Sequence, residues 1–381
     1  MTNRKSYDVI VVGAGSMGMS AGYELARRGL KTLLIDAFNP PHIMGSHHGE
    51  PRLIRHAYAG GEAYVRMALR ADEKWVEIEE RTGEKLLDRA GVLNMADTAV
   101  YSYEARRDDA SALDVHVEWL DAADINRRWP NIKLPEHYRG MYEPNAGYLF
   151  SEKCIEAYKR LALEAGAELL PNTFVTGIKA EQGGVTVQTN HESFAAGHVI
   201  LSAGAWFKTL EPFISLPIRT IRKVVGWFEP ADSSFNSEVF PGFTLGTQNG
   251  GYYGFPSIRG AGLKIGRHDT GEHWQPGDEL APFGAFPEDE DDLRSVLEAF
   301  MPGAAGKLLR SAVCKYEHTP DDNFIIDSHP EHANVLLAGG FSGHGFKFSS
   351  VVGEILADLV EKGKSEQDLR LFSLSRFAAI T

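Results

Sequence analysis

The sequence predicts an α/β protein in which two domains are interleaved along the chain. A short apolar strand at residues 7–12 runs through a glycine-rich turn into a helix, and a second strand follows at once. Residues 219–315 are instead rich in strands and aromatic side chains, and the α/β texture returns from residue 323 onward. We therefore expect a first domain made of residues 1–85, 145–218 and 318–381, and a second domain made of residues 86–144 and 219–317.

The glycine-rich turn carries the pattern Gly-x-Gly-x-x-Gly at Gly13, Gly15 and Gly18. The first glycine allows a tight turn, the second lets the backbone approach a pyrophosphate, and the third lets the helix pack closely on the strand. The helix, expected over residues 19–28, offers free N–H groups at its start to the phosphates. The next strand ends on Asp36, whose carboxylate can accept hydrogen bonds from ribose hydroxyls. These features predict an adenine dinucleotide and leave open whether it is NAD or FAD.

Apolar periodicity and turn-forming residues predict the other elements. A helix is expected to start with Ser151 as its cap and to stop at Gly166, with Ile155, Leu161 and Leu163 on its apolar face. Other helices are expected at residues 62–81, 99–109, 122–129 and 288–300, and a last helix runs through Lys362. Strands are expected at residues 31–35, 91–95, 198–206, 224–228, 251–256, 262–268, 323–327 and 335–340, with shorter ones between residues 167 and 189.

Residues 39–56 form a predicted loop rich in turn formers and histidine. Long loops inside compact domains are usually functional. Its adjacent His47 and His48 would point in opposite directions from an extended segment, which argues against a joint metal site. Since no other ligand cluster stands out, we expect no metal.

Composition excludes several classes of protein. The net charge of −13 over 381 residues argues against a general nucleic-acid binder. Two cysteines do not make a disulfide framework, and no apolar run approaches the length of a membrane span. Residues 1–5 lead into the first strand without a secretory apolar region, and residues 378–381 are not a peroxisomal address. We expect a cytoplasmic protein with no membrane or nucleic-acid partner.

The split first domain favours a flavin, because NAD dehydrogenases usually keep their cofactor domain continuous. The glycine-punctuated segment 341–347 supports this prediction, since it lies where a strand passes into a helix. Backbone N–H groups at such a helix start can stabilise the negative charge of a reduced flavin. The alternative is an ordinary tight loop.

Seven blocks spread along the whole chain match one known family. They are residues 11–19, 45–49, 52–58, 252–256, 312–314, 324–327 and, most specifically, 343–348. These blocks closely resemble the monomeric sarcosine oxidase family, whose nearest sister is N-methyltryptophan oxidase. The resemblance implies a discontinuous Rossmann-like FAD-binding domain with a β-sheet-rich substrate domain, as in D-amino acid oxidase. It also implies FAD attached through its 8α-methyl group to a cysteine, which Cys314 matches. From the residues alone, Cys314 and Cys154 would both be interpreted as structural.

The resemblance also implies roles for individual residues. Arg55 and Lys347 match the pair that holds the substrate carboxylate, for which a planar guanidinium and a point charge are suited. Lys264 matches the residue that activates oxygen, and Arg52 one beside the flavin ring. Residues expected at the catalytic centre are Lys264, His268, Arg52, Tyr253 and Tyr316, and those expected to bind substrate are Arg55, Lys347, Tyr253 and Thr244. Residues expected to bind the cofactor are Gly13, Gly15, Ser16, Met17, Gly18, Asp36, Ser46, His47, Arg52, Val175, Gly204, Cys314, Gly343, His344, Gly345 and Lys347.

Plainer interpretations exist for the same residues. Two arginines three apart often share a solvated face, a strand lysine is often on the surface, and buried tyrosines often only pack. The chain also departs from the family, with Ala59-Gly60-Gly61-Glu62 where Gly-Glu-Gly is common. Thr244 resembles the N-methyltryptophan enzyme more than the sarcosine enzyme, so the size of the substrate stays open.

The implied activity is oxidative demethylation of sarcosine or a similar N-methyl amino acid. Such a substrate gives a hydride equivalent to the flavin, and hydrolysis of the imine releases formaldehyde and the primary amino acid. Molecular oxygen then takes the electrons and forms hydrogen peroxide. The alternatives are an oxidase of N-methyltryptophan or of fructosyl amino acids, a dehydrogenase that passes electrons to a carrier, and a non-catalytic FAD-binding module. Family members are usually monomers, and we expect a monomer here.

Overall fold

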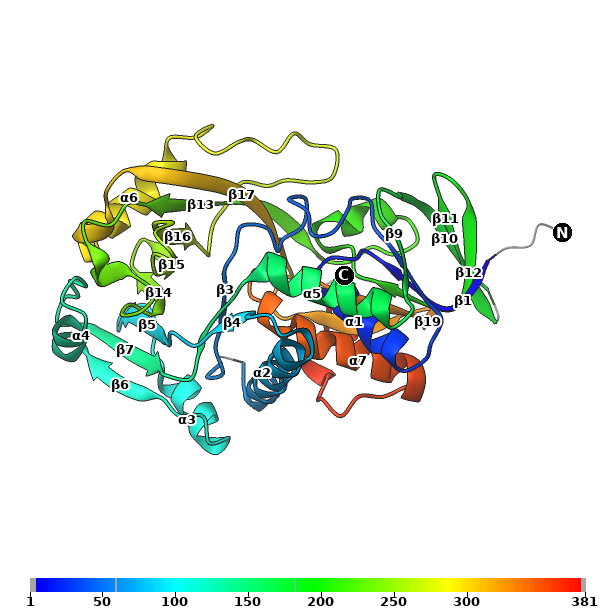
Figure 1. Cartoon of the computed structure of the whole chain (residues 1–381), viewed down its shortest axis with the longest axis horizontal. Helices are drawn as coiled ribbons and strands as arrows, with labels where there is room; N and C mark the ends of the chain where they lie inside the picture. The colour runs from blue at the N-terminus through cyan, green and yellow to red at the C-terminus, as the bar shows by residue number, and fades with distance from the viewer. Residues whose placement is uncertain (1–4, 59, 182, 378–381) are drawn as a thin grey trace.

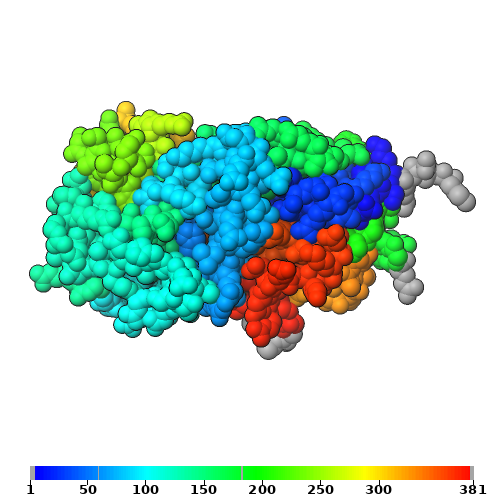
Figure 2. All heavy atoms as spheres, turned by 60° about the horizontal axis from the view of Figure 1, so that its bottom comes forward, coloured from blue at the N-terminus to red at the C-terminus, as the bar shows by residue number. Residues whose placement is uncertain are grey.

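The computed structural model describes residues 5–58, 60–181 and 183–377 and shows an elongated molecule with two large sheets (Figure 1). The first sheet lies with helices α1, α5 and α7 in one half, and the second sheet lies with α4 and α6 in the other. Figure 2 shows residues near α2 at the surface between the two halves. The predicted α/β class is confirmed. Residues 1–4, Ala59 in the divergent loop, Gln182 at a predicted turn and residues 378–381 lie outside the described ranges.

The first sheet follows the order β10-β11-β12-β1-β2-β9, with β19 paired to β12 and β18 paired to β19. Strand β1 is parallel to both β12 and β2, and its alternate residues enter two different hydrophobic cores. This burial on both faces explains why β1 reads as a continuous apolar run. The strands are β1 (Ser6–Val12), β2 (Thr32–Ile35), β9 (Glu168–Leu170), β10 (Val175–Glu181), β11 (Gly184–Thr189), β12 (Ser193–Leu201), β18 (Ile325–His329) and β19 (His332–Gly339).

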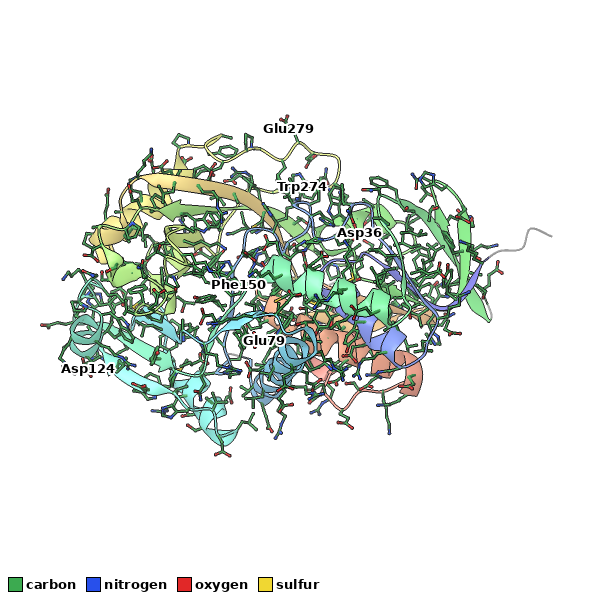
Figure 3. The ribbon with its side chains drawn as sticks, in the orientation of Figure 1. Asp36, Glu79, Asp124, Phe150, Trp274 and Glu279 are labelled. Atoms are coloured by element: carbon green, nitrogen blue, oxygen red, sulfur yellow. The ribbon has the colours of Figure 1, made fainter. Side chains whose placement is uncertain are left out.

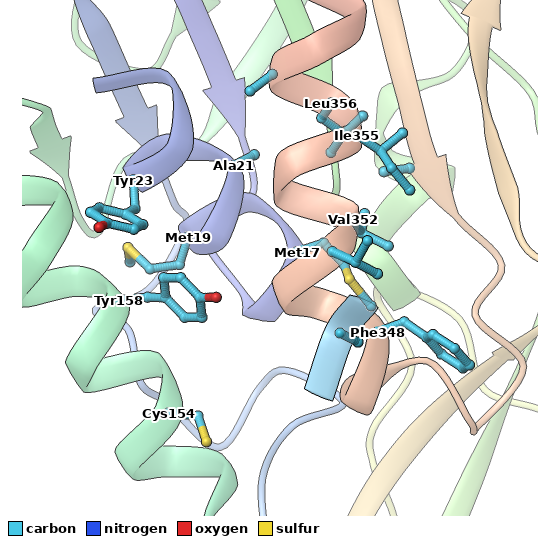
Figure 4. Packing of buried hydrophobic residues seen from close by; sticks show 14 of the residues in the cluster. Met17, Met19, Ala21, Tyr23, Cys154, Tyr158, Phe348, Val352, Ile355 and Leu356 are labelled. Atoms are coloured by element: carbon cyan, nitrogen blue, oxygen red, sulfur yellow. The ribbon is translucent and has the colours of Figure 1, made fainter. Parts of the chain in front are cut away.

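Four helices pack together over one face of this sheet: α1 (Ser16–Arg27), α2 (Glu62–Thr82), α5 (Ser151–Glu164) and α7 (Ser349–Lys362). Figure 4 shows α1 between α5 and α7, with Tyr158 of α5 beside Met19 and Tyr23. A Cβ at Gly353 would lie 2.2 Å from Ser20 Oγ, so a glycine is needed where α7 meets α1. This packing fixes the start of α1 relative to the segment that precedes α7.

The second sheet has the order β17-β13-β16-β15-β14-β5-β7-β6, and all its pairs are antiparallel except β14 with β5. Helices α4 (Ala122–Arg128) and α6 (Glu288–Phe300) contribute to its core, whereas α3 (Glu104–Ala112) belongs to a smaller cluster. The strands are β5 (Val92–Asp97), β6 (Glu118–Asp121), β7 (Tyr138–Glu143), β13 (Arg219–Phe228), β14 (Gly242–Thr247), β15 (Gly250–Phe255), β16 (Leu263–Arg267) and β17 (Leu308–His318).

A third, three-stranded sheet lies near the boundary between the halves, and it consists of β3 (Arg52–Ile54), β8 (Gly147–Leu149) and β4 (Leu87–Asp88). The predicted loop 39–56 is therefore wrong at its end, where β3 pairs with β8. Short 3₁₀ helices cover Gly204–Leu210, Ser233–Phe235, Pro302–Ala304, Phe346–Phe348, Arg370–Phe372 and Leu374–Phe377.

Three local predictions need correction. Ser151 is the first residue of α5 and not its cap, because its hydroxyl donates to His47 O at 2.9 Å instead. Leu163 is 45% exposed, since α5 buries the stripe through Cys154, Tyr158 and Ala162. The helix expected from residue 99 starts at Glu104, because the backbone of Asp97 accepts hydrogen bonds from the N–H groups of residues 100 and 101.

Other differences concern strands. The predicted strand 198–206 ends at Leu201, where Ser202 turns back to donate a 2.7 Å hydrogen bond to Gly13 O. Strands β3, β4, β6, β7, β8, β14 and β17 are additional to the predicted elements. Among the described helices, none combines the length and the hydropathy needed to cross a bilayer.

Candidate active site

A cavity of about 1070 Å³ lies between the glycine-rich turn, the loop before β3, the faces of β14 and β15, and the segment that leads into α7. This is larger than the roughly 300–1,000 Å³ of an ordinary small-molecule site. All the predicted site residues line it except Gly18, Lys264 and Cys314. The structure thus brings residues from three sheets to one place.

The glycine-rich turn is built as the sequence predicts. Gly13 has φ +92°, and a Cβ on Gly18 would lie 1.8 Å from Gly13 O, so both positions require glycine for the turn itself. Gly15 differs, because an added Cβ would meet only His47 Nδ1, at 3.9 Å. The space beside Gly15 is therefore left open by the neighbouring side chains. It lies at the start of α1, where Ser16 and Met17 also line the cavity. A pyrophosphate fits this opening and the N–H groups beside it.

Asp36 helps to order the loop around this turn. Its Oδ2 accepts a 2.7 Å hydrogen bond from Ala14 N, and its Oδ1 accepts one of 2.8 Å from Phe38 N. The ring of His42 lies 3.2 Å from the same Oδ1. Figure 3 places Asp36 in the half of the molecule that holds the first sheet. The carboxylate also lines the cavity, so the predicted ribose contact is compatible with its position.

An aromatic group beside Asp36 went undetected in the sequence. The ring of Phe38 lies 5.1 Å from that of His42, 5.6 Å from Trp206 and 6.1 Å from Phe174, and all four residues line the cavity. Val175 and Gly204 lie in the same part of the lining. Flat apolar surfaces of this kind suit a nucleobase. The sequence feature that could have indicated this group is the position of Phe38, two residues after Asp36 at the end of the strand.

Two buried titratable side chains lie at the loop before β3: His47 belongs to the loop, and Glu317 comes from β17. Burial, followed by the effect of His42, lowers the pKa of His47 to about 3. The hydroxyl of Ser46 donates a 3.0 Å hydrogen bond to Glu317, a cavity residue that the sequence did not indicate. Burial raises the pKa of Glu317 to about 7, although Ser46 and the Phe341 N–H both donate to its carboxylate.

Two cations hold the same loop from opposite sides. The guanidinium of Arg52 donates to the carbonyls of Gly49 at 2.7 Å, Pro51 at 3.0 Å and Ser46 at 3.0 Å. Lys264, which is 1% exposed, donates to Gly49 O at 2.5 Å and to Pro51 O at 3.2 Å. Burial, and then the charge of Arg52, holds the pKa of Lys264 well below its usual value. Lys264 lies behind the cavity lining, so the interpretation as a surface lysine is wrong.

The face of the second sheet presents a tyrosine pair. The hydroxyl of Tyr316 donates to that of Tyr253 at 3.2 Å, and the ring of His268 lies 5.7 Å from Tyr316. Burial lowers the pKa of His268 to about 4, with a further effect of Lys223. Cys314 is buried against Tyr316 and lies directly opposite Lys223 in the β13–β17 pair. Cys154 is a buried thiol in the helical core (Figure 4), which fits its predicted structural role.

The segment before α7 differs from a simple helix start. Residues Phe346–Phe348 form a 3₁₀ turn, and α7 begins only at Ser349. Gly343 has φ +74°, and an added Cβ would lie 2.2 Å from the ring of Tyr316. The ring of His344 lies 2.8 Å from the hydroxyl of Tyr58, and its other nitrogen lies 3.0 Å from Asp322 O. Gly345 also lines the cavity.

The far wall of the cavity is cationic. Arg55 Nη1 donates to Asn94 Oδ1 at 2.9 Å, while its Nε is buried and has no hydrogen-bond partner among the described residues. Lys347 Nζ donates to His344 O at 2.5 Å and to the Tyr58 hydroxyl at 3.3 Å. Burial, and then Arg55 and Arg106, holds the pKa of Lys347 well below its usual value. Arg55 and Lys347 therefore share one buried wall, as a carboxylate site requires.

Within the described ranges, no group of three or more histidine, cysteine, aspartate or glutamate side chains is arranged to hold a metal ion. The cavity has the glycine-rich turn on one side and basic side chains and tyrosines on the other.

The family model of FAD dependent oxidoreductases matches residues 8–359. A monomeric sarcosine oxidase from Bacillus sp. (strain B-0618) is 49% identical over 97% of this chain and 96% of that protein. An N-methyl-L-tryptophan oxidase from Salmonella arizonae is 44% identical over 98% of this chain and 99% of that protein.

Among solved structures, the open form of NikD, an unusual amino acid oxidase essential for nikkomycin biosynthesis, has a TM-score of 0.84 at 25% identity and 97% coverage of both chains. L-Proline dehydrogenase from P. horikoshii has a TM-score of 0.86 at 23% identity and 99% coverage of both chains, which shows a shared fold.

Proposed function

The chain belongs to the family of FAD-dependent oxidoreductases, and we propose that it oxidatively demethylates an N-methyl amino acid. The observation that carries the proposal is the cationic wall inside the dinucleotide cavity. Arg55 and Lys347 line it together, and the buried Arg55 Nε has no partner among the residues described. A substrate carboxylate would supply that partner.

The residues present fit FAD. The opening above Gly15 and the start of α1 would hold its pyrophosphate, Asp36 its ribose, and the aromatic group around Phe38 its adenine. Arg52 and the segment from Gly343 to Lys347 would lie at its isoalloxazine end. When bound, FAD supplies the acceptor for a hydride equivalent and passes electrons on to dioxygen.

The protein would contribute binding, orientation and charge. Arg55 and Lys347 hold the carboxylate, and the Tyr253–Tyr316 pair lies across the cavity to orient the amine. Thr244 stands beside Tyr253 in the β14–β15 register and limits the space for the side chain. His268, with its lowered pKa, stays neutral at pH 7 and can accept a hydrogen bond from the amine. Lys264 would provide the cation for the reaction with oxygen.

The proposal also covers the cofactor bond, the domain division, the products, the oligomeric state and the location of the protein. We infer a thioether between Cys314 and FAD, supported by the position of the thiol against Tyr316. We retain the predicted domain division, supported by the separate sheets that its segments enter. The products would be the primary amino acid, formaldehyde and hydrogen peroxide. A monomer is supported by the names of the sarcosine oxidase relatives, and a cytoplasmic location by the two free thiols.

The test is a panel of sarcosine, other N-methyl amino acids, N-methyl-L-tryptophan and a fructosyl amino acid. We expect an N-methyl amino acid to bleach the bound flavin without oxygen and to give peroxide and formaldehyde in air. Bleaching without peroxide would indicate a dehydrogenase, and no bleaching by any secondary amine would overturn the proposal. N-methyl-L-tryptophan is the second candidate, because Ala96, Gly246 and Gly251 leave part of the lining without large side chains.

A further inference from the structure

Strands β5, β14 and β15 place two rows of side chains across the substrate end of the cavity. Asn94 pairs with Thr244, and Thr244 lies opposite Tyr253, so the three side chains share one face of the sheet. Two residues further along each strand, the row is Ala96, Gly246 and Gly251. All three members of this second row line the cavity. The first row is polar, and the second leaves room for a substrate side chain beside it.

Arg106 lies beside Asn94, a member of the first row. It comes from α3, is 6% exposed and lines the cavity. Its Nε and Nη2 both donate to Ala57 O, at 3.2 and 2.7 Å, and Nη2 lies 3.5 Å from Asn94 Oδ1. Nη1 forms no hydrogen bond with any residue in the described ranges. One edge of a buried guanidinium is therefore fixed, and the other remains available.

The carboxylate nearest to Arg106 is already engaged. Glu143 lies 3.6 Å from Arg106 Nη2, but its Oε2 accepts the N–H groups of His56 and Ala57 at 2.8 and 3.0 Å. Its Oε1 accepts the Asn94 amide at 3.3 Å. Glu143 thus anchors the β5–β7 wall and forms a buried ion pair of 3.6 Å with Nη2 of Arg106, whereas Nη1 of Arg106 has no hydrogen-bond partner among the described residues.

The charges at this wall do not balance. Three basic groups lie at this wall, those of Arg55, Arg106 and Lys347. After the larger effect of burial, the charge of Arg55 lowers the pKa of Arg106, and the charges of Arg55 and Arg106 lower the pKa of Lys347. Glu143 brings one acidic group to the same wall. A buried charge is costly unless it is paired. A substrate with one carboxylate satisfies Arg55 and Lys347 and provides no carboxylate for Arg106. A second carboxylate on the substrate would complete the balance.

We propose that the preferred substrate is an N-methyl derivative of an acidic amino acid, whose side-chain carboxylate binds Arg106. The inference rests on the proposed oxidase function and specifies its substrate class. Asn94 and Thr244 hold the wall in place, since the Thr244 hydroxyl and Arg55 both donate to Asn94 Oδ1, at 3.1 and 2.9 Å. Arg106 is then the residue that distinguishes an acidic side chain from its neutral amide.

The experiment compares matched pairs on the holoenzyme: N-methyl-L-aspartate against N-methyl-L-asparagine, and N-methyl-L-glutamate against N-methyl-L-glutamine. We expect kcat/KM for anaerobic flavin reduction to favour the acid of at least one pair by about tenfold or more, since a desolvated Arg–carboxylate contact discriminates strongly. An amide that reacts as well as its acid in both pairs overturns the inference while the oxidase function stands. Failure of every secondary amine to reduce the flavin would overturn the function itself.

Arg106→Met tests the residue, and Arg107→Met on the same helix is the matched control, because Arg107 is exposed and pairs with Asp108. The acid-to-amide ratio should fall about tenfold or more in Arg106→Met and stay unchanged in Arg107→Met. Equal losses for acid and amide would show that Arg106 only supports the wall. If Arg106→Met does not fold, titrations of the wild-type protein test the inference instead. Succinate should perturb the flavin spectrum at a lower concentration than its half-amide does. The reverse order would overturn the inference.

Discussion

Lys264 and Arg52 donate hydrogen bonds to the same two carbonyl oxygens, those of Gly49 and Pro51, although they come from different sheets. Strand β16 carries Lys264, and strand β3 carries Arg52. The loop before β3 is therefore fixed between two cations beside the cavity. Each cation lowers the cost of burying these two carbonyls while raising the cost of burying the other charge.

This arrangement predicts a specific effect of Lys264→Met on the reaction with oxygen. Reoxidation of the reduced flavin should slow by about 10²–10³-fold, the range found when one preorganised charge-stabilising group is removed. Because burial and Arg52 lower the pKa of Lys264, the wild-type rate should fall as pH rises and the cation is lost. The variant should lack this pH dependence. Stopped-flow mixing with oxygen measures both, and equal slowing of the anaerobic reduction would instead indicate a collapsed loop.

Arg55 provides a prediction about the carboxylate. Arg55→Ala should raise the dissociation constant of methoxyacetate, an oxygen isostere of sarcosine, by about 30-fold or more. Loss of one partner from a buried charged pair costs about 2–5 kcal/mol. Titration of the flavin absorbance measures the constant, with Arg66→Ala as control, because Arg66 is exposed and pairs with Glu62. Unchanged binding in Arg55→Ala would exclude Arg55 from the carboxylate site.

The sequence was a good guide where one residue type has one physical reason to be present. Gly13 and Gly18 could be predicted because backbone atoms occupy the space of any side chain. Lys264 was placed in the site by resemblance, and the structure shows that it is buried, which the strand pattern alone could not show. The apolar run of β1 and the amphipathic periodicity of α2 also predict these elements with nearly the observed bounds.

Residues that depend on distant partners could not be predicted. Glu317 lies in β17 and meets Ser46, which is 271 positions away in the sequence, so nothing local identifies it as a cavity residue. Arg106 belongs to a polar helix that looks solvated, and only its contact with Ala57 shows that it is buried. The cap assigned to Ser151 failed for the same reason, since His47 O competes for the hydroxyl.

Cys314 leads to a prediction about the cofactor bond. The wild-type protein should keep its yellow colour in the pellet after acid precipitation, whereas Cys314→Ala should release its flavin to the supernatant. Cys154→Ala is the matched control, because that thiol lies in the helical core and should leave the bond intact. Absorbance of pellet and supernatant gives the covalent fraction. Complete release from the wild-type protein would rule out the thioether.

Gly15 and Gly18 should respond differently to the same substitution. A methyl group on Gly15 meets only His47 Nδ1, at 3.9 Å, so Gly15→Ala should fold normally and bind FAD weakly. A methyl group on Gly18 would lie 1.8 Å from Gly13 O, so Gly18→Ala should lower the melting temperature of the protein. Circular dichroism melts and the flavin-to-protein absorbance ratio separate the two effects. Full flavin content in Gly15→Ala would show that the pyrophosphate lies elsewhere.

Glu317 should make stability depend on pH in a defined window. Burial raises its pKa to about 7 in the folded protein, above the ordinary value of 4.5, so the folded state binds the proton more tightly. Stability is therefore lost as pH rises from 4.5 to about 7, and Glu317→Gln, which stays neutral, escapes this loss. The variant should exceed the wild type by about 3 kcal/mol at pH 8 and by little at pH 4.5, since one pKa unit is worth about 1.4 kcal/mol. Denaturant unfolding at both pH values measures the gap. Glu298→Gln, an exposed position on α6, should show none. A Glu317→Gln gap that is equal at the two pH values would mean that folding does not raise the pKa of this carboxyl.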